Sequence, residues 1–291
     1  MSTKNLLVEL FVEELPPKAL NKLGEAFSTT LVESLKAQGL VAAAAKFEAF
    51  ASPRRLAVHV ADVAAVAADK PITLKLMPVN IALDANGEPT QALMKKLAGM
   101  GLDASIVPQL KRAPDGKAEA LFHDSVVKGV ALAEGLQKAL EQALTSLPIP
   151  KVMTYQLADG WSSVNFVRPA HKLVALHGAD IVPISVLGLQ AGRETLGHRF
   201  EAAVSPVVLE NADSYAHQLQ TQGAVIASFA ERRAEIVRQL QAAAAKAGSG
   251  LQPLQDDALL DEVTALVERP NVLTCQFEPE FLQVPQECLI L

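Results

Sequence analysis

The stretch that decides the fold is Phe166–Phe200, which reads FVRPAHKLVALHGADIVPISVLGLQAGRETLGHRF. It contains two apolar runs, Leu173–Leu176 and Ile181–Leu189, separated by the turn-like segment His177–Asp180. Apolar runs rich in Val and Ile on either side of such a turn are typical of paired β-strands. Cations and imidazoles then come at the ends of a small sheet, where they suit a polyanion or an acidic partner surface: Arg168, His171, Arg193, His198 and Arg199.

The N-terminal part of the chain predicts a strand, a helix and two further strands. Leu6–Val12 reads as a strand, and Pro17 suits the first turn of a helix, where a missing N–H removes no hydrogen bond. Apolar residues then recur at helical spacing up to Gly39, which suits the position after a helix. Phe47–Ala51 and Leu56–Val66 are expected strands. This opening indicates an α+β fold with mixed or antiparallel sheets and packed helices.

Two regions are expected. Residues 1–205 are predicted to form the α+β domain, and residues 206–291 a mainly helical segment. Further elements predicted in the first region are a helix at Gln91–Gly99, a loop or weak hairpin at Leu110–Ala118, a strand at Ala120–Val127 and a helix at Val130–Ser146. Those predicted in the second are a mostly helical stretch at Ser214–Ala247, a helix at Asp256–Leu266 and a short strand at Val272–Gln276.

Composition limits the class of protein. The 291 residues are 50% hydrophobic and carry a net charge of −6, which argues against a protein that coats nucleic acid but allows a local basic face. Cys275 and Cys288 match no zinc or redox spacing and are expected to be reduced structural thiols. No signal peptide or run of about 18 apolar residues occurs, so we expect a cytoplasmic protein without a membrane span.

Motifs for catalysis are missing from the sequence. It has no H-x-E or H-E-x-x-H motif, no glycine-rich phosphate loop and no G-x-S-x-G elbow, so we predict no catalytic, cofactor or metal residues. The pair Glu13-Glu14 is compatible with acid–base work, but a role at the positive end of the following helix is the simpler interpretation.

Several single residues allow two interpretations. Arg54-Arg55 lies at the predicted turn between strands, as a solvated pair or as a contact to phosphate or a partner. Lys151 is presented by a proline-stiffened loop and could contact RNA or a partner subunit. In Gly197–Phe200, the structural interpretation buries Phe200 in the core and pairs Arg199 with a carboxylate. His171 and His177 are expected to be packing or capping residues.

A set of segments runs in order along almost the whole chain: Leu7–Leu10 with Glu13–Leu20, Ser52–Ala57, Leu147–Met153, Phe166–Pro169, Gly197–Phe200, Glu262–Glu268 with Pro270, and Val284-Pro285. Together these segments resemble the bacterial glycyl-tRNA synthetase β subunit. The sequence departs from the family at Met77-Pro78, where Gly-Pro is usual, and at Tyr155, where Trp is usual. The family's subunit is longer, so a chain that ends at Leu289–Leu291 is expected to be its N-terminal piece.

The resemblance implies an accessory role. In that family an α subunit uses ATP with Mg²⁺ to activate glycine, and the β subunit is needed for tRNA binding and complete charging, within an expected α2β2 holoenzyme. This piece alone would then be catalytically inactive. The candidate contacts to tRNA or the α subunit are Arg54, Arg55, Lys151, Arg168, Arg193, His198 and Arg199.

Two other functions stay open at this stage. A structural module that docks the α subunit without touching RNA is favoured slightly by the acidic pI of about 5.6. An editing-type hydrolase would need a pocket with a positioned water or nucleophile, for which the sequence shows no motif. Convergence of the cationic residues on one surface would favour RNA contact.

Overall fold

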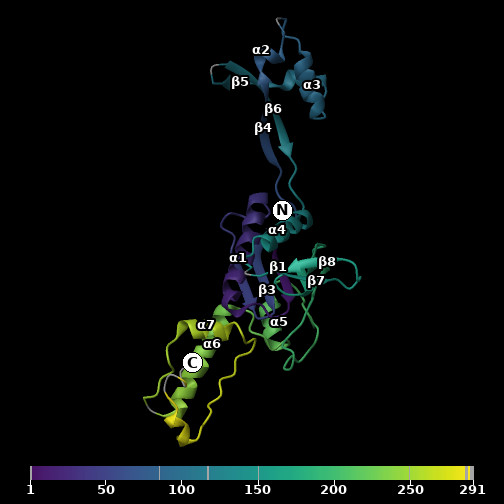
Figure 1. Cartoon of the computed structure of the whole chain (residues 1–291). Coiled ribbons are helices and arrows are strands. Elements are labelled where there is room, and N and C mark those ends of the chain that lie inside the picture. Colours follow the sequence, from purple (N-terminus) through teal and green to yellow (C-terminus); the bar gives the residue numbers. More distant parts are fainter. Residues whose placement is uncertain are drawn as a thin grey trace.

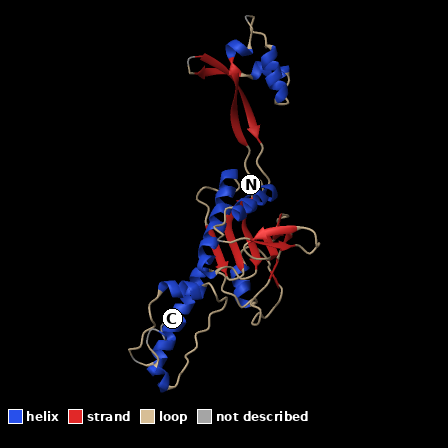
Figure 2. Ribbon diagram, in the orientation of Figure 1, coloured by secondary structure: helices blue, strands red, loops and turns tan. Residues whose placement is uncertain are grey.

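A computed structural model of the chain describes residues 2–84, 86–116, 118–149, 151–248, 250–285 and 288. Pro150 and Leu289–Leu291, which the sequence analysis names, lie outside this set. Figure 1 shows a central body from which a small unit projects at one end and a helical segment extends at the other. Figure 2 shows strands concentrated in the body and the projecting unit, and the α+β class is confirmed.

The body is built on a seven-stranded sheet. Six strands follow the order β11-β12-β9-β1-β3-β2, and β10 pairs with β9. The centre is β1, antiparallel to both β3 and β9, whereas β12 runs parallel to β9. The bounds are β1 Thr3–Val12, β2 Phe47–Ser52, β3 Arg55–Ala64, β9 Ala170–His177, β10 Asp180–Ile181, β11 Ser185–Val186 and β12 Leu189–Gly192.

Each face of this sheet has its own apolar core. Because side chains alternate along a strand, Leu6, Val8 and Leu10 face the helices α1 (Pro17–Gln38) and α4 (Leu132–Thr145). Leu7 faces the opposite side, where α5 (Tyr215–Thr221) and the chain around it form the cover. Glu9 lies on that second face and is fully buried.

Many local predictions are confirmed. Helix α1 starts at Pro17, and Gly39 follows it in the left-handed region with φ 77°. The strands β2 and β3 meet at the predicted turn. Helix α3 has the predicted bounds, Gln91–Gly99. The expected hairpin around Pro114 is the β5–β6 pair.

Two strand predictions are wrong. The run Ile181–Leu189 is not one strand, because Pro183 interrupts it and Leu187-Gly188 both have positive φ, so the backbone turns back on itself. It supplies the short strands β10 and β11 and the start of β12 instead. Val272–Gln276 contains no strand and forms a loop that pairs with no sheet.

The projecting unit is a three-stranded sheet, β4-β6-β5, with α2, α3 and a 3₁₀ helix packed on it. It has a separate small core around Leu76, Leu93, Leu97 and Leu121. Its bounds are β4 Lys70–Pro78, α2 Val79–Ala82, α3 Gln91–Gly99, a 3₁₀ helix at Ala104–Gln109, β5 Lys111–Asp115 and β6 Ala118–Val127.

Two small ladders and the C-terminal helices complete the structure. The hairpin of β7 (Met153–Gln156) and β8 (Ser163–Phe166) carries Trp161 in its turn. The strands β13 (Glu194–Thr195) and β14 (Val207–Val208) pair with each other. The C-terminal elements are α6 Phe229–Ala247, α7 Asp257–Thr264 and a 3₁₀ helix at Pro279–Gln283.

Candidate functional site

Several of the segments that carry the resemblance meet around the turn between β2 and β3. Arg54, in this turn, is only 6% exposed. Its Nε and Nη2 donate to the two carboxylate oxygens of Glu268, at 3.2 and 2.7 Å, and Nη2 also donates to the carbonyl oxygen of Gly197 at 2.8 Å. A side-on pair of this kind fixes the orientation of both groups. The β2–β3 turn, the 197–200 turn and the segment after α7 are therefore tied together.

Arg55 is fully buried directly behind this pair. Its Nη1 donates to Ser52 Oγ at 2.9 Å and to Glu268 Oε1 at 3.1 Å, and its Nη2 donates to the carbonyl oxygen of Leu196 at 2.5 Å. Burial alone would lower the pKa of the guanidinium, but the carboxylates of Glu268 and Glu9 outweigh burial and raise it. Arg55 is therefore a charged structural residue in the core.

Three further buried polar residues extend the cluster. The Tyr215 hydroxyl donates to Glu9 Oε2 at 2.5 Å, and the Thr195 hydroxyl donates to Glu9 Oε1. Burial, followed by the charge of Glu9, raises the pKa of Tyr215 well above its usual value. Arg232 of α6 donates to the carbonyl oxygens of Thr264 and Ala51, at 2.9 and 2.8 Å. Burial, with repulsion from Arg55, lowers the pKa of Arg232 to about 10.

The carboxylates of Glu13 and Glu14, which precede α1, pair with cationic side chains, and no side chain caps the first turn of that helix. Glu13 contacts His171 Nε2 at 2.9 Å and Arg199 Nη2 at 2.7 Å, and Glu14 contacts Arg199 Nη2 at 3.1 Å. Burial would raise the pKa of Glu13, but His171 and Arg199 outweigh burial and lower it. Arg168 Nε donates to the carbonyl oxygen of Glu14 at 2.9 Å. The expected pairing of Arg199 with a carboxylate is confirmed.

The prediction that Phe200 anchors the core is wrong, since its side chain is 90% exposed. The turn packs closely on neighbouring backbone at Gly197, where a Cβ would lie 2.4 Å from the carbonyl oxygen of Gly223. His198 caps the turn, because its Nδ1 accepts from the N–H groups of Phe200 and Glu201 at 3.3 and 3.2 Å. Phe200 therefore points away from the core.

A small hollow of about 270 Å³ opens beside this cluster. Its lining comes from four separate parts of the chain: Glu14, Pro53, Arg54, His198, Arg199, Phe200, Leu266, Val267, Glu268 and Arg269. Arg269 Nη1 pairs with Glu201 at 3.0 Å. The hollow combines buried and exposed cations with one exposed aromatic ring.

The remaining predicted contacts lie apart from the hollow. Arg193 donates to the carbonyl oxygens of Ala179 and Leu209, at 2.8 and 3.4 Å. Lys151 is exposed just before the β7–β8 hairpin. The structure thus brings together Arg54, Arg55, His198 and Arg199, with Arg168 beside them through Glu14, and leaves Lys151 and Arg193 outside the lining.

Five members of the cluster were missed by sequence reasoning: Glu9, Thr195, Tyr215, Arg232 and Glu268. An ionisable residue inside an apolar strand run was the available signal for Glu9. Glu268 lies in a segment that resembles the family, but its partners are more than 200 residues away in the sequence. Spacing alone gives no sign of such a pairing.

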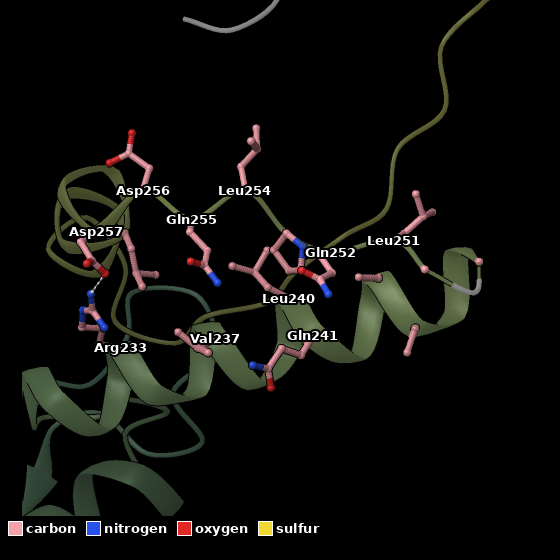
Figure 3. A pocket seen from close by; sticks show the side chains of 16 residues that line it. Arg233, Val237, Leu240, Gln241, Leu251, Gln252, Leu254, Gln255, Asp256 and Asp257 are labelled. Carbon is pink, nitrogen blue, oxygen red and sulfur yellow. Dashed lines mark hydrogen bonds and ion pairs between the residues drawn. The ribbon is translucent and has the colours of Figure 1, made fainter.

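A larger hollow of about 850 Å³ lies along α6 and the segment that leads into α7 (Figure 3). Its lining includes Val237, Leu240, Leu251 and Leu254, and Arg233 pairs with Asp257 at one end. None of the predicted contact residues lines it.

Neither a metal cluster nor a membrane span is found in the part of the chain that the structure describes. No three His, Cys, Asp or Glu side chains gather there as a metal site would require. No helix among those residues has the length and apolar character needed to cross a bilayer.

Comparison with known proteins agrees with the resemblance. A family model described as the glycyl-tRNA synthetase beta subunit matches residues 6–291. The chain belongs to this family. It is 72% identical to the glycine–tRNA ligase beta subunit of Dechloromonas aromatica, over 100% of this chain and 42% of that protein. It is 74% identical to the subunit of the same name from Leptothrix cholodnii, over 100% of this chain and 40% of that protein. The chain thus spans about two fifths of these relatives' length.

Proposed function

We propose that the chain is an accessory part of glycine–tRNA ligase, which supports tRNA binding and subunit assembly for ATP-dependent charging of tRNA with glycine. The observation that carries the proposal is the family match over residues 6–291. In this scheme the ligase works in the cytoplasm as an α2β2 assembly. The α subunit binds ATP with Mg²⁺ and activates glycine, and this chain supplies contacts without performing chemistry.

The geometry divides the candidate contacts into two roles. Arg54 and Arg55 have a structural role, since their side chains are buried and paired with Glu268 beneath the surface. Arg199, which is half exposed, and Lys151, Arg168, Arg193 and His198, which are exposed or half-buried, are the groups that would contact tRNA or the α subunit. Charge reversal at Arg54 would place a second carboxylate beside Glu268 in the core, so it is unsuitable as a surface test.

The test uses the assembled ligase with Arg199→Glu and Lys151→Glu, and with Arg238→Glu as the matched control on the exposed face of α6. If these side chains contact phosphates, tRNA affinity falls in the first two variants. The salt dependence of binding also becomes shallower, because binding with one phosphate contact fewer releases fewer counterions from the tRNA. The control keeps the wild-type affinity. Unchanged tRNA binding and unchanged assembly in both test variants would contradict the proposed contacts.

The alternative is a docking module for the α subunit without RNA contact. The net charge of −6 and the exposed Phe200 and Leu266 favour this second candidate. The two alternatives are separated by measuring how well each variant captures the α subunit. If the chain is only a docking module, the variants lose assembly, and their tRNA affinity falls only to the extent that assembly is lost.

A further inference from the structure

We propose that the hollow between Phe200 and Arg54 binds one unpaired base of an RNA strand. The inference rests on the proposed function in tRNA charging and names the chemistry of one contact within it. Three groups carry it: an exposed aromatic ring, a rigid hydrogen-bond donor and a carboxylate acceptor, all lining one hollow of about 270 Å³.

Phe200 supplies the stacking surface. Its ring is 90% exposed, and its orientation is set by His198, whose ring packs edge-on at 6.2 Å between centroids. The turn that carries it is fixed by the two N–H bonds to His198 and by the close approach of Gly197 to Gly223. Aromatic rings held in this way on RNA-binding surfaces stack with bases of any sequence.

Arg54 supplies a donor that is already oriented. Its Nε and Nη2 are used on Glu268 and on the carbonyl oxygen of Gly197, and the guanidinium lies over the ring of Phe11 with Cζ 5.2 Å from the centroid. No hydrogen bond joins Nη1 to any described residue. Among the described side chains, the only fully buried nitrogen or oxygen without a partner is Nε of Arg55. Since Nη1 of Arg54 has no partner and is not in that class, it is not fully buried and reaches solvent.

Glu14 supplies an acceptor elsewhere on the lining. Arg199 Nη2 lies 3.1 Å from Oε1 of this carboxylate, so Oε2 is the oxygen that a base would use. Adenine, cytosine and guanine each present donors and acceptors side by side on one edge. A fixed guanidinium N–H and a carboxylate in one hollow match such an edge.

The local charge favours a base over a phosphate. Each cation on the lining already has a carboxylate: Arg54 has Glu268, Arg199 has Glu14, and Arg269 has Glu201. A phosphate inside the hollow would meet Glu14 and Glu268 without an unpaired cation to offset their repulsion, so the phosphate contact proposed for Arg199 would lie at the rim, outside the hollow. A neutral base meets no such cost.

The experiment measures tRNA affinity of the assembled ligase with Phe200→Ala, Phe200→Leu and Phe200→Tyr, with Trp161→Ala as the control. Trp161 is 92% exposed but does not line the hollow. Base stacking predicts that Ala and Leu weaken binding about 5- to 100-fold, that Tyr stays within about twofold, and that Trp161→Ala changes nothing. Because stacking is uncharged, the fold-loss stays the same at low and high salt.

Three results would overturn the inference. The first is wild-type affinity in the Ala variant. The second is full retention by Leu, which would indicate apolar packing against protein. The third is loss of α-subunit assembly with no separate loss of tRNA affinity, which would make Phe200 a protein contact. If the wild-type ligase itself fails to bind tRNA, the proposed function falls along with this site, whereas wild-type binding with unaffected Phe200 variants overturns this inference alone.

Discussion

Arg54 and Glu268 form a side-on ion pair across 214 residues of sequence, with Nε 3.2 Å from Oε1 and Nη2 2.7 Å from Oε2. Arg55 shares the same carboxylate from the buried side. Glu268 therefore joins the segment after α7 to the β2–β3 turn of the central sheet. The stability of this junction depends on one carboxyl group between two guanidinium groups.

Removal of that carboxylate should be costly. Glu268→Ala leaves Arg54 and Arg55 buried without their shared partner, and breaking a buried pair from one side typically costs about 3–5 kcal/mol. The free energy of unfolding, measured by chemical denaturation, should fall by that amount. The matched control is Glu262→Ala, since Glu262 lies 4.0 Å from Lys18 in an exposed pair that is expected to contribute about 1 kcal/mol or less. Equal losses of unfolding free energy in the two variants would show that the buried pair contributes no more to stability than the exposed pair.

Acid should weaken the fold through the same group. Burial would raise the pKa of Glu268, but Arg55 and Arg54 outweigh burial and lower it from 4.5. The folded state therefore holds the proton less readily than the unfolded state. Its stabilising contribution is complete above pH 4.5 and declines as pH falls through the lower, folded value.

Glu268→Gln should flatten the decline of unfolding free energy below about pH 4.5 while lowering stability at neutral pH. Glu48→Gln is the control, because burial and the charge of Glu231 raise the pKa of Glu48 from 4.5, which gives the opposite sign. That variant removes a group that gains stability as pH falls, so its unfolding free energy should decline in acid at least as steeply as that of the wild type. If the unfolding free energy of Glu268→Gln declined with acid as steeply as that of the wild type, Glu268 would not be the source of the acid sensitivity.

Phe200→Ala should leave the melting temperature almost unchanged, within the effect of about 0.5 kcal/mol that is usual for surface substitutions. Phe27→Ala is the contrast, since Phe27 is fully buried between α1 and the sheet and its truncation typically costs about 3–5 kcal/mol. Thermal unfolding of both variants provides the check. A large loss in Phe200→Ala would mean that its ring is buried in solution.

Gly129→Ala should destabilise the fold by about 2 kcal/mol or more, because the new Cβ would lie 1.7 Å from the carbonyl oxygen of Ala67 and only backbone movement could relieve the clash. Gly99→Ala is the matched substitution, since no atom lies within 4 Å of a Cβ at that position in α3. It should be neutral or stabilising by up to about 1 kcal/mol. Denaturant midpoints that agree for the two variants would contradict the close approach at Gly129.

Local signals made a large part of the fold predictable. Pro17 and Gly39 mark the ends of α1, and regular apolar spacing fills the turns between them, so the helix could be placed from neighbouring residues alone. The same holds for α3. The parallel pairing of β12 with β9 could not be predicted, because it depends on a backbone reversal at Leu187-Gly188 inside an apolar run that reads as one strand.

The candidate site was predictable only in part, since Arg54, Arg55, His198 and Arg199 could be named from the sequence but their roles and their partner Glu268 could not. Adjacent arginines at a turn usually face solvent, and Arg54 and Arg55 are buried only because Glu9 and Glu268 arrive from distant parts of the chain. Phe200 follows the reverse pattern, since an aromatic residue after a polar run suggests burial, but the turn held by His198 leaves its ring 90% exposed. Both outcomes are decided by long-range packing.

The two chain connections between the projecting unit and the body lie next to each other. Lys70 pairs with Val127 at the base of β4 and β6, and Asp69 receives Lys128 Nζ at 2.8 Å and the N–H of Gly129 at 2.9 Å just below them. The two ends of residues 70–127 therefore lie side by side, and the unit has its own core. Topologically it is an insertion in the body. A tight turn that joined Asp69 to Lys128 directly would close the chain without stretching any strand of the central sheet. We therefore expect the body to tolerate exchange, lengthening or loss of this unit while the cluster around Glu268 stays in place.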